Sequence, residues 1–376
     1  MLKRFLAVFT AMLLTLATFA FAAELRQDHP DTYTVKKGDT LWDISARFLQ
    51  KPWLWPEIWQ ANPQVKNPHL IYPGDVLSLV YINGQARLVS NDNGPQIRSG
   101  EAISSIPLAE LEPYVKQLTI VSDPKSLPYV IGLEEDRLLS SSGQVAYVHG
   151  LANPQPGDEV QIARPISVFA LGRVKNGRHV GGVSPLDFRG DTFHRHWGYL
   201  DAPYEAHGNV LGYEMMKQSI GQVTRVQGDT AIVLLKEEGR EVRVGDRVMP
   251  VEEQPYDANF YPQSPTSVPD GATILAVPDG LEFSGTHNVV ALSIGAADGV
   301  RNGTTFSVWH DGANRGDTVS HRNNIAIASN KSRMPDDYLG HVMVFRTFDK
   351  VSYALAMDGI RPIAVGDLLK DPDAVQ

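Results

Sequence analysis

Hydrophobic and polar positions follow a helical pattern in only one short part of the chain, residues 33–80. There, a β-prone run ends at a Gly-Asp turn, and Leu41, Ile44 and Phe48 then recur at the spacing of an amphipathic helix. After a proline, a second short helical pattern reaches Trp59, and an apolar run before residue 80 is typical of a strand. The pattern therefore predicts the order strand, helix, helix, strand.

From about residue 127 the pattern changes to short Val- and Ile-rich runs separated by Gly-Asp or Asp-Gly turns, which indicates strands. Two stretches read alike: one runs from Gly221 to Gly245-Asp246, the other from Gly340 to Gly366-Asp367. The distance from the first glycine to the glycine of the Gly-Asp turn is 24 residues in one stretch and 26 in the other. We expect a duplicated barrel-like or sandwich-like module. The turn near Gly157-Asp158 is interpreted as the end of a degenerate third copy.

The resulting fold class is α+β multidomain, with a βααβ module followed by repeated, mostly-β modules. The expected divisions are a signal peptide at 1–22, a βααβ module at 32–82, a linker at 83–125, a β-rich module at 126–252 with an inserted loop at 184–209, and a β-rich module at 270–371 with an inserted loop at 310–337.

The first residues have the pattern of an export signal. Lys3 and Arg4 precede an uncharged apolar run, and Ala20-Phe21-Ala22 offers a small-x-small cleavage site. A membrane anchor is the alternative, but the run is at the short limit for crossing a bilayer. We expect cleavage, no stable membrane insertion afterwards, and a periplasmic protein that is soluble or wall-associated.

Charge and composition narrow the classes of partner. The 376 residues carry a formal net charge of −9, which argues against a general nucleic-acid binder because such a protein needs a basic face. The chain has no cysteine, so disulfides and thiol nucleophiles are excluded. No cofactor is expected.

Two separated motifs in residues 33–80 resemble the LysM family. The first is Tyr33-Thr34-Val35 followed by Gly38-Asp39-Thr40-Leu41-Trp42, and the second is Asn67-Pro68 followed by Leu70-Ile71-Tyr72-Pro73-Gly74-Asp75. The resemblance implies a βααβ fold that binds N-acetylglucosamine-containing glycans such as peptidoglycan or chitin. An aromatic segment, Gln50–Pro56, departs from the family's polar turn between the helices.

The resemblance also implies that the two motif loops face each other and form a groove. A neutral amino sugar needs fixed backbone N–H and C=O groups beside a shallow apolar surface, and a turn at a helix N-terminus offers such N–H groups. By this resemblance the glycan contacts are Gly38, Asp39, Thr40, Leu41, Pro68, Leu70, Ile71 and Pro73. Asp39 and Ile71 could instead serve only the turn and the core.

Four tryptophans in this module are candidates for stacking on sugar rings. Trp42 and Trp59 occupy helical positions, where most aromatic side chains are core, so we expect them to be buried. Trp53 or Trp55 lies on the departing segment, and either could be exposed as a platform.

The remaining chain resembles the long C-terminal portion of LysM-containing proteins from Gram-negative proteobacteria. The resemblance is strongest over Met343–Leu355 and includes Gly245–Pro250. It implies no chemistry for this portion.

A wall-cleaving enzyme is the rival to a pure binding protein. His194 and His196 resemble half of a zinc-peptidase motif, but no His-x-x-x-Asp precedes them in the mature chain, so no metal is assigned. No catalytic residue is assigned, although two carboxylates distant in sequence could still meet. We therefore expect a non-catalytic peptidoglycan-binding adaptor or wall anchor whose partners are glycan strands and an envelope protein. The alternative is a cell-wall hydrolase, or a regulator of one, whose active site lies in the β-rich region.

Overall fold

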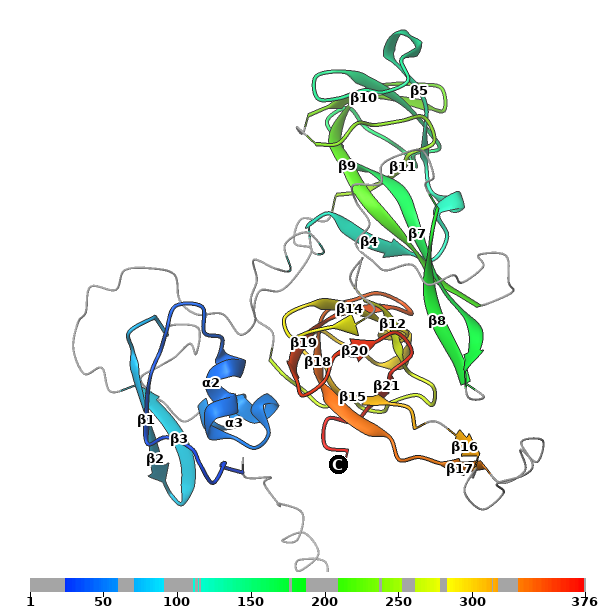
Figure 1. Cartoon of the computed structure of the whole chain (residues 1–376). Helices are drawn as coiled ribbons and strands as arrows, with labels where there is room; N and C mark the ends of the chain where they lie inside the picture. The colour runs from blue at the N-terminus through cyan, green and yellow to red at the C-terminus, as the bar shows by residue number, and fades with distance from the viewer. Residues whose placement is uncertain are drawn as a thin grey trace, which may run out of the picture. The chain divides into compact units, whose positions relative to one another are not determined.

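The structure is a computed structural model in which two compact units divide the chain between residues 106 and 107 (Figure 1). Each unit is described by itself. The described residues are 24–59, 71–90, 111, 114, 116–175, 178–186, 209–236, 239–251, 261–277, 283–312, 314–316 and 331–374. The expected signal peptide, 1–22, lies outside them. No helix within these ranges is long and apolar enough to cross a membrane.

Unit 1 has the predicted strand–helix–helix–strand order and one further strand. Its elements are β1 (Thr32–Thr34), α2 (Leu41–Phe48), the 3-10 turn η1 (Pro52–Leu54), α3 (Trp55–Trp59), β2 (Val76–Ile82) and β3 (Gln85–Ser90). The strands form one antiparallel sheet in the order β1-β2-β3. Asn83 and Gly84 join β2 to β3, both with positive φ, as a tight hairpin requires. The expected linker at 83–125 therefore begins too early, because the sheet continues to Ser90.

The core of unit 1 lies between the helices and the sheet. Helix α2 starts at Thr40, which caps it, and its apolar face buries Leu41, Ile44 and Phe48. The same cluster takes in residues of α3 and of both long strands. Leu25 also belongs to this unit, because it forms an antiparallel β-bridge with Leu49. The module is thus longer at both ends than the expected 32–82.

Unit 2 contains two closed rings of six strands. Ring 1 has the order β9-β10-β6-β5-β11-β7, and β7 pairs with β9 to close it. Its strands are β5 (Tyr129–Leu133), β6 (Val145–His149), β7 (Glu159–Lys175), β9 (Asn209–Gln227), β10 (Thr230–Leu235) and β11 (Arg247–Pro250). Two more strands, β4 (Leu118–Val121) and β8 (Arg178–Pro185), pair with the extended β9 and β7 respectively. Since β4 pairs with β9, the expected linker also ends too late.

Ring 2 repeats this order as β18-β19-β14-β12-β21-β15. Its strands are β12 (Ile274–Ala276), β14 (Val289–Leu292), β15 (Thr305–His310), β18 (Asp337–Thr347), β19 (Ser352–Gly359) and β21 (Leu368–Lys370). Backbone hydrogen bonds between β12 and β21 close it, for example from Leu369 N–H to the Ala272 carbonyl at 2.9 Å. The minor elements of unit 2 are β13 (Phe283–Ser284), β16 (Asn314–Gly316), β17 (Lys331–Arg333), β20 (Ile363–Ala364), and the 3-10 turns η2 (Pro124–Ser126), η3 (Glu134–Asp136) and η5 (Ala296–Asp298).

The strand register shows that the two rings are copies of one plan. In ring 1, Val148 pairs with Val130 on one side and with Ala231 on the other. In ring 2, Leu292 pairs in the same way with Ile274 and Ser352. The strand that follows Val130 has a β-bulge, and so does the strand that follows Ile274. The predicted duplication is therefore present at the level of individual residue pairs.

The register of the repeat aligns the Gly-Asp turns that end the two stretches, Gly245 with Gly366, but not their first glycines. Gly157 donates its N–H to the carbonyl of Val223, and in ring 2 Gly303 donates to the carbonyl of Val344. Val223 thus corresponds to Val344, and Gly221 does not correspond to Gly340. The turn at Gly157-Asp158 leads into the third strand of ring 1 and has its counterpart before β15, so it does not end a third copy.

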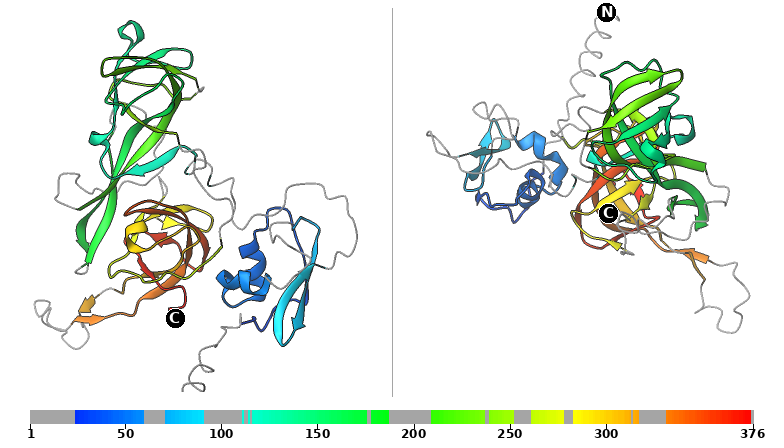
Figure 2. Two further views of the ribbon diagram at one scale, coloured as in Figure 1. Left: turned by 180° about the vertical axis from the view of Figure 1, so that it is seen from behind. Right: turned by 90° about the horizontal axis from the view of Figure 1, so that it is seen from above.

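The expected inserted loops occur at the same place in both rings, between the third and fourth strands. The expected loop 184–209 begins within the end of β8, which runs to Pro185, and the β16–β17 hairpin lies inside the expected loop 310–337. In Figure 2 the orange β16–β17 hairpin projects from ring 2 in both views. The rest of the two loops, 187–208 and 317–330, lies outside the described residues.

Five turns in the described residues share one geometry, in which the fourth residue is an aspartate that follows a glycine. The aspartate N–H donates to the carbonyl of the first residue, and its carboxylate accepts the first residue's N–H at 2.7–2.9 Å. The glycine has a φ of 88° to 103°, which only glycine adopts without strain. The turns are Lys36–Asp39, Tyr72–Asp75, Gln155–Asp158, Arg243–Asp246 and Ala364–Asp367.

The aspartates of the corresponding turns in the two rings each contact a basic side chain at the same position. Asp246 accepts two hydrogen bonds from the buried Arg164, at 2.8 and 2.9 Å. Asp367 faces Nδ1 of His310 at 2.8 Å, and His310 occupies the position in β15 that Arg164 occupies in β7. The ring 1 pair is nearly inaccessible to water, so its two charges depend on each other.

We predict that Asp246→Asn lowers the free energy of unfolding of unit 2 by about 3–5 kcal/mol, because the buried Arg164 guanidinium loses its carboxylate. The asparagine oxygen can still accept the turn's N–H, so the loss reports on the ion pair. Asp158→Asn is the matched control: its turn is the same but exposed, and its cost should be below about 1 kcal/mol. Chemical denaturation of the full chain measures both. Equal losses of unfolding free energy in Asp246→Asn and Asp158→Asn would contradict the stabilising role of the Arg164–Asp246 ion pair.

Candidate glycan-binding site

The two Gly-Asp turns of unit 1 lie side by side at one end of its sheet. The first follows β1 and the second precedes β2, and these strands pair antiparallel with Thr34 opposite Val76. Beyond that pair, Val35 N–H donates to the Asp75 carbonyl at 2.9 Å, and Gly74 N–H donates to the Val35 carbonyl at 2.8 Å. The sheet therefore fixes the distance between the turns without any flexible connection.

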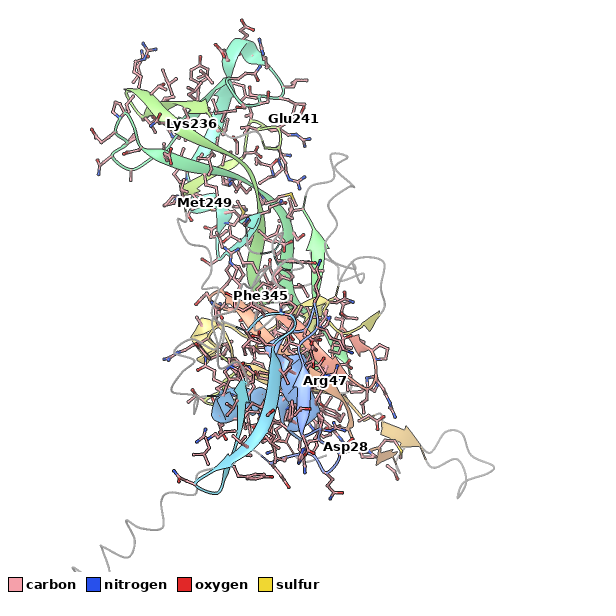
Figure 3. The ribbon with its side chains drawn as sticks, turned by 90° about the vertical axis from the view of Figure 1, so that its left-hand side faces the viewer. Asp28, Arg47, Lys236, Glu241, Met249 and Phe345 are labelled. Atoms are coloured by element: carbon pink, nitrogen blue, oxygen red, sulfur yellow. The ribbon has the colours of Figure 1, made fainter. Side chains whose placement is uncertain are left out.

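Asp39 organises the first turn. One of its oxygens accepts the Lys36 N–H at 2.8 Å and the hydroxyl of Tyr33 at 2.8 Å. The guanidinium of Arg47, on α2, lies 4.7 Å from the centre of the Tyr33 ring (Figure 3). Burial and the hydrogen bond to Asp39 raise the pKa of the Tyr33 hydroxyl, so Tyr33 donates to the carboxylate at any pH near neutrality. The Lys36 N–H and the Tyr33 hydroxyl therefore hold Asp39 in the turn, and Arg47 holds the Tyr33 ring in place.

The start of α2 stands directly behind this turn. Thr40 Oγ1 accepts the Asp43 N–H at 3.1 Å, and the Asp43 carboxylate accepts from the Thr40 N–H and hydroxyl at 3.1 and 2.7 Å. This reciprocal cap holds the first helical turn in place. Because N–H groups at the start of a helix have no carbonyl partner within the helix, donors gather beside the exposed Gly38.

The structure separates the predicted contact residues into two groups. Gly38 and Pro73 are exposed at the tips of the two turns, and Asp39 is half-buried between them. Thr40 is buried, as are Leu41 and Ile71, whose side chains belong to the core. Neither Leu41 nor Ile71 can therefore offer its side chain to a glycan, and only their backbone atoms remain as candidates. Pro68 and Leu70 lie outside the described residues.

The four tryptophans of unit 1 are all core residues. Trp42 and Trp59 are buried, as predicted from their helical positions. The sequence left open that Trp53 or Trp55 is exposed, and the structure excludes this: their exposed fractions are 6% and 0%. The segment Pro52–Leu54 forms a 3-10 turn that continues into α3, and this geometry directs both rings inward. No tryptophan in residues 24–59 can serve as a stacking platform.

Three residues that the sequence reasoning did not assign lie at the turns. Tyr33 and Arg47 brace Asp39, and Tyr72 is the first residue of the second turn, where its N–H donates to the Asp75 carboxylate at 2.9 Å. Tyr72 is partly exposed. The role of Tyr33 could have been predicted from its position in β1, because its side chain lies on the same edge of the sheet as the turn that follows this strand.

Within the described residues, no group of three or more His, Asp or Glu side chains is placed to hold a metal ion. His194 and His196 lie outside the described residues. The described site offers backbone N–H and C=O groups, one proline ring, one tyrosine ring and the exposed side chains of Lys36 and Lys37 in the first turn. It therefore presents polar groups beside a small apolar surface.

Comparisons with known proteins agree with this geometry. The LysM domain model matches residues 33–80. The uncharacterized protein YqbP of Bacillus subtilis is 40% identical over 60 residues, which cover 13% of this chain and 27% of YqbP. The potassium binding protein Kbp of Escherichia coli is 48% identical over 48 residues, covering 12% of this chain and 32% of Kbp. This chain thus aligns with less than a third of either relative's length. A LysM domain implies binding of peptidoglycan-type or chitin-type glycans.

We predict that Thr40→Ala lowers the free energy of unfolding of unit 1 by about 1–2 kcal/mol, because the substitution removes the helix cap. Thr34→Ala, on the exposed face of β1, is the control and should change it by less than about 0.5 kcal/mol. Tryptophan fluorescence during chemical denaturation follows this unit, since four of the chain's six tryptophans are in it. Equal effects would contradict the capping role.

Proposed function

We propose that this chain is an exported, non-catalytic protein of the periplasm that binds peptidoglycan through unit 1. In this proposal it comes from a Gram-negative proteobacterium, its first 22 residues are a cleaved signal, and unit 2 holds an envelope protein near the wall. The observation that carries the proposal is the pair of hydrogen-bonded Gly-Asp turns within the LysM match.

The chemistry of the turns supports an amino-sugar ligand. N-Acetylglucosamine is neutral, its ring has apolar faces, and its acetamido group offers one donor and one acceptor. The exposed turn tips at Gly38 and Pro73 present backbone groups and apolar carbons, with no exposed carboxylate at either tip. Asp39 and Asp75 direct their carboxylates into their own turns, so they shape the site without adding charge to its surface.

A single site made of two turns should bind a glycan with low affinity. A few backbone hydrogen bonds contribute about 0.5–1.5 kcal/mol each, and ordering a flexible glycan offsets part of this. The expected dissociation constant is therefore about micromolar to millimolar. Glycan strands repeat the same unit many times, so a weak site still retains the protein at the wall.

The buried His341 has a structural role in ring 2. Its Nδ1 lies 2.7 Å from the Tyr338 hydroxyl and 3.0 Å from Asp358, and its Nε2 faces the Pro372 carbonyl at 3.4 Å. Both ring nitrogens contact the protein, which is the arrangement of a histidine that holds a fold together. Potassium binding belongs to Kbp by its name.

We predict that Pro73→Glu weakens binding to N-acetylglucosamine oligomers and to purified sacculi by about tenfold, because it places a charge and a flexible side chain at the exposed tip of the second turn. Pro156→Glu is the matched control: it makes the same change in the same type of turn, in ring 1, and should leave binding unchanged. Titration calorimetry with the oligomers and co-sedimentation with sacculi measure the two variants. Equal binding by the wild type and Pro73→Glu would show that the glycan does not bind at these two turns.

The non-catalytic part of the proposal has its own test. We predict that the mature chain releases no soluble fragments from purified sacculi, while it still sediments with them. Chromatography of the supernatant measures the release. Fragments that accumulate with time and with protein concentration would favour the alternative, a cell-wall hydrolase with an active site in the β-rich unit.

A further inference from the structure

The two rings have corresponding surfaces, and only one of these surfaces is covered. Ile131 and Leu275 are the bulged residues that follow Val130 and Ile274, so they occupy the same position in the two rings. Leu275 is fully buried, whereas Ile131 is 50% exposed. The difference therefore lies in what covers each ring.

Leu275 is covered by the arm of ring 1. This arm, which we call arm 1, consists of β8 and the stretch of β7 that pairs with it, beyond the closed ring. Strand β8 contacts β12 of ring 2 (Figure 1). The contact is close, because a Cβ added to Gly181 on β8 would overlap Cδ1 of Leu275. A backbone without side chain thus lies directly on this apolar position.

The corresponding surface of ring 1 is an exposed apolar patch. Val244 is 54% exposed and lies beside Ile131, because the neighbouring Gly245 N–H donates to the Val130 carbonyl. Leu138 is 87% exposed, and Leu139 adjoins it next to the bridge between Ser140 and Val242. We call Ile131, Leu138, Leu139 and Val244 the Ile131 face. It lies near the segment between β10 and β11, in which Figure 3 labels Lys236 and Glu241.

Ring 2 has an arm at the same place in its sequence of strands. The hairpin of β16 and β17, which we call arm 2, leaves ring 2 between its third and fourth strands, as arm 1 leaves ring 1. Arm 2 projects from ring 2 on the side away from β5, so it is not positioned to cover the Ile131 face of its own chain (Figures 1 and 2).

We propose that the Ile131 face binds arm 2 of a second copy of this chain. The contact repeats between molecules the contact that arm 1 makes with Leu275 within one molecule. Because the two surfaces differ, the association is head to tail, and each added copy leaves one Ile131 face and one arm 2 free.

Charge does not select the pairing. The loop beside Leu138 contains Glu134, Glu135 and Asp136, and Glu135 pairs with Arg137. On arm 2, the Arg333 guanidinium already pairs with Asp311 and Asp336 of its own chain. The correspondence between arm 1 and arm 2 is therefore what carries the proposal. With only four apolar side chains on the face, the association should be weak.

The first experiment is sedimentation velocity on the full mature chain from about 1 µM to about 300 µM, a range that detects weak association. We expect the sedimentation coefficient to rise with concentration, and Ile131→Glu to weaken the association by about tenfold or more, because a charge cannot be buried unpaired. Tyr81→Glu, an equally exposed apolar position in unit 1, is the control and should associate like the wild type. Circular dichroism confirms that each variant is folded. A chain that stays monomeric throughout, or an Ile131→Glu variant that associates normally, would overturn the proposal.

The second experiment identifies the partner surfaces. The chain has no cysteine, so Leu138→Cys and Ser332→Cys each introduce one thiol, and both positions are exposed. A short bismaleimide should join a Leu138→Cys chain to a Ser332→Cys chain in a mixture, and should join neither variant to itself. Cross-linking of Leu138→Cys with its own kind would indicate a symmetric contact and overturn the assignment of arm 2. A cross-link within a single chain that carries both substitutions, Leu138→Cys and Ser332→Cys, would also overturn the assignment of arm 2 of a second copy.

Discussion

A carboxylate that accepts the N–H of the residue three positions earlier is the interaction on which both units depend. It fixes each Gly-Asp turn in a single shape, and the glycine supplies the left-handed backbone that the shape requires. In unit 1 two such turns form the opposite sides of the candidate site. In unit 2 the turns at Asp246 and Asp367 directly precede β11 and β21, the last strand of each ring in the sequence. One local device thus positions the proposed binding surface and completes the scaffold.

The sequence predicted the Gly-Asp turns and the order of the elements in unit 1, because turn signals and helical spacing act over a few residues. The reciprocal cap between Thr40 and Asp43, three residues apart, is a contact of the same local kind. Contacts that are distant along the chain could not be predicted in the same way. Strand β3 lies within the expected linker, because its pairing with β2 cannot be recognised from residues 85–90 alone. The repeat was recognised, but glycines spaced 24 and 26 residues apart could not settle its register, because hydrogen bonds from distant turns set it.

In the candidate site, too, the sequence gives the type of each residue but not the direction in which its side chain points. Helical spacing predicted correctly that Trp42 would be buried, and it left open whether Trp53 or Trp55 is exposed; both are buried. Leu41 and Ile71 belong to the matched motifs, yet their side chains lie in the core. A motif records both what contacts a ligand and what holds the contacting loop, and sequence alone does not separate the two. Burial separates them, and it leaves the backbone of the two turns as the surface with binding chemistry.

The duplicated rings show how one fold can acquire two different environments. Corresponding positions keep their place in the sheet while their side chains follow what lies against them. Arg164 is enclosed and needs the full charge of Asp246, whereas its counterpart His310 is half exposed and makes a single contact with Asp367. Leu275 is covered by a strand with a glycine at the contact, whereas Ile131 is open to solvent. Because exposed apolar surface costs free energy in water, covering the Ile131 face with a second copy, as proposed, would give both rings the same environment at this position.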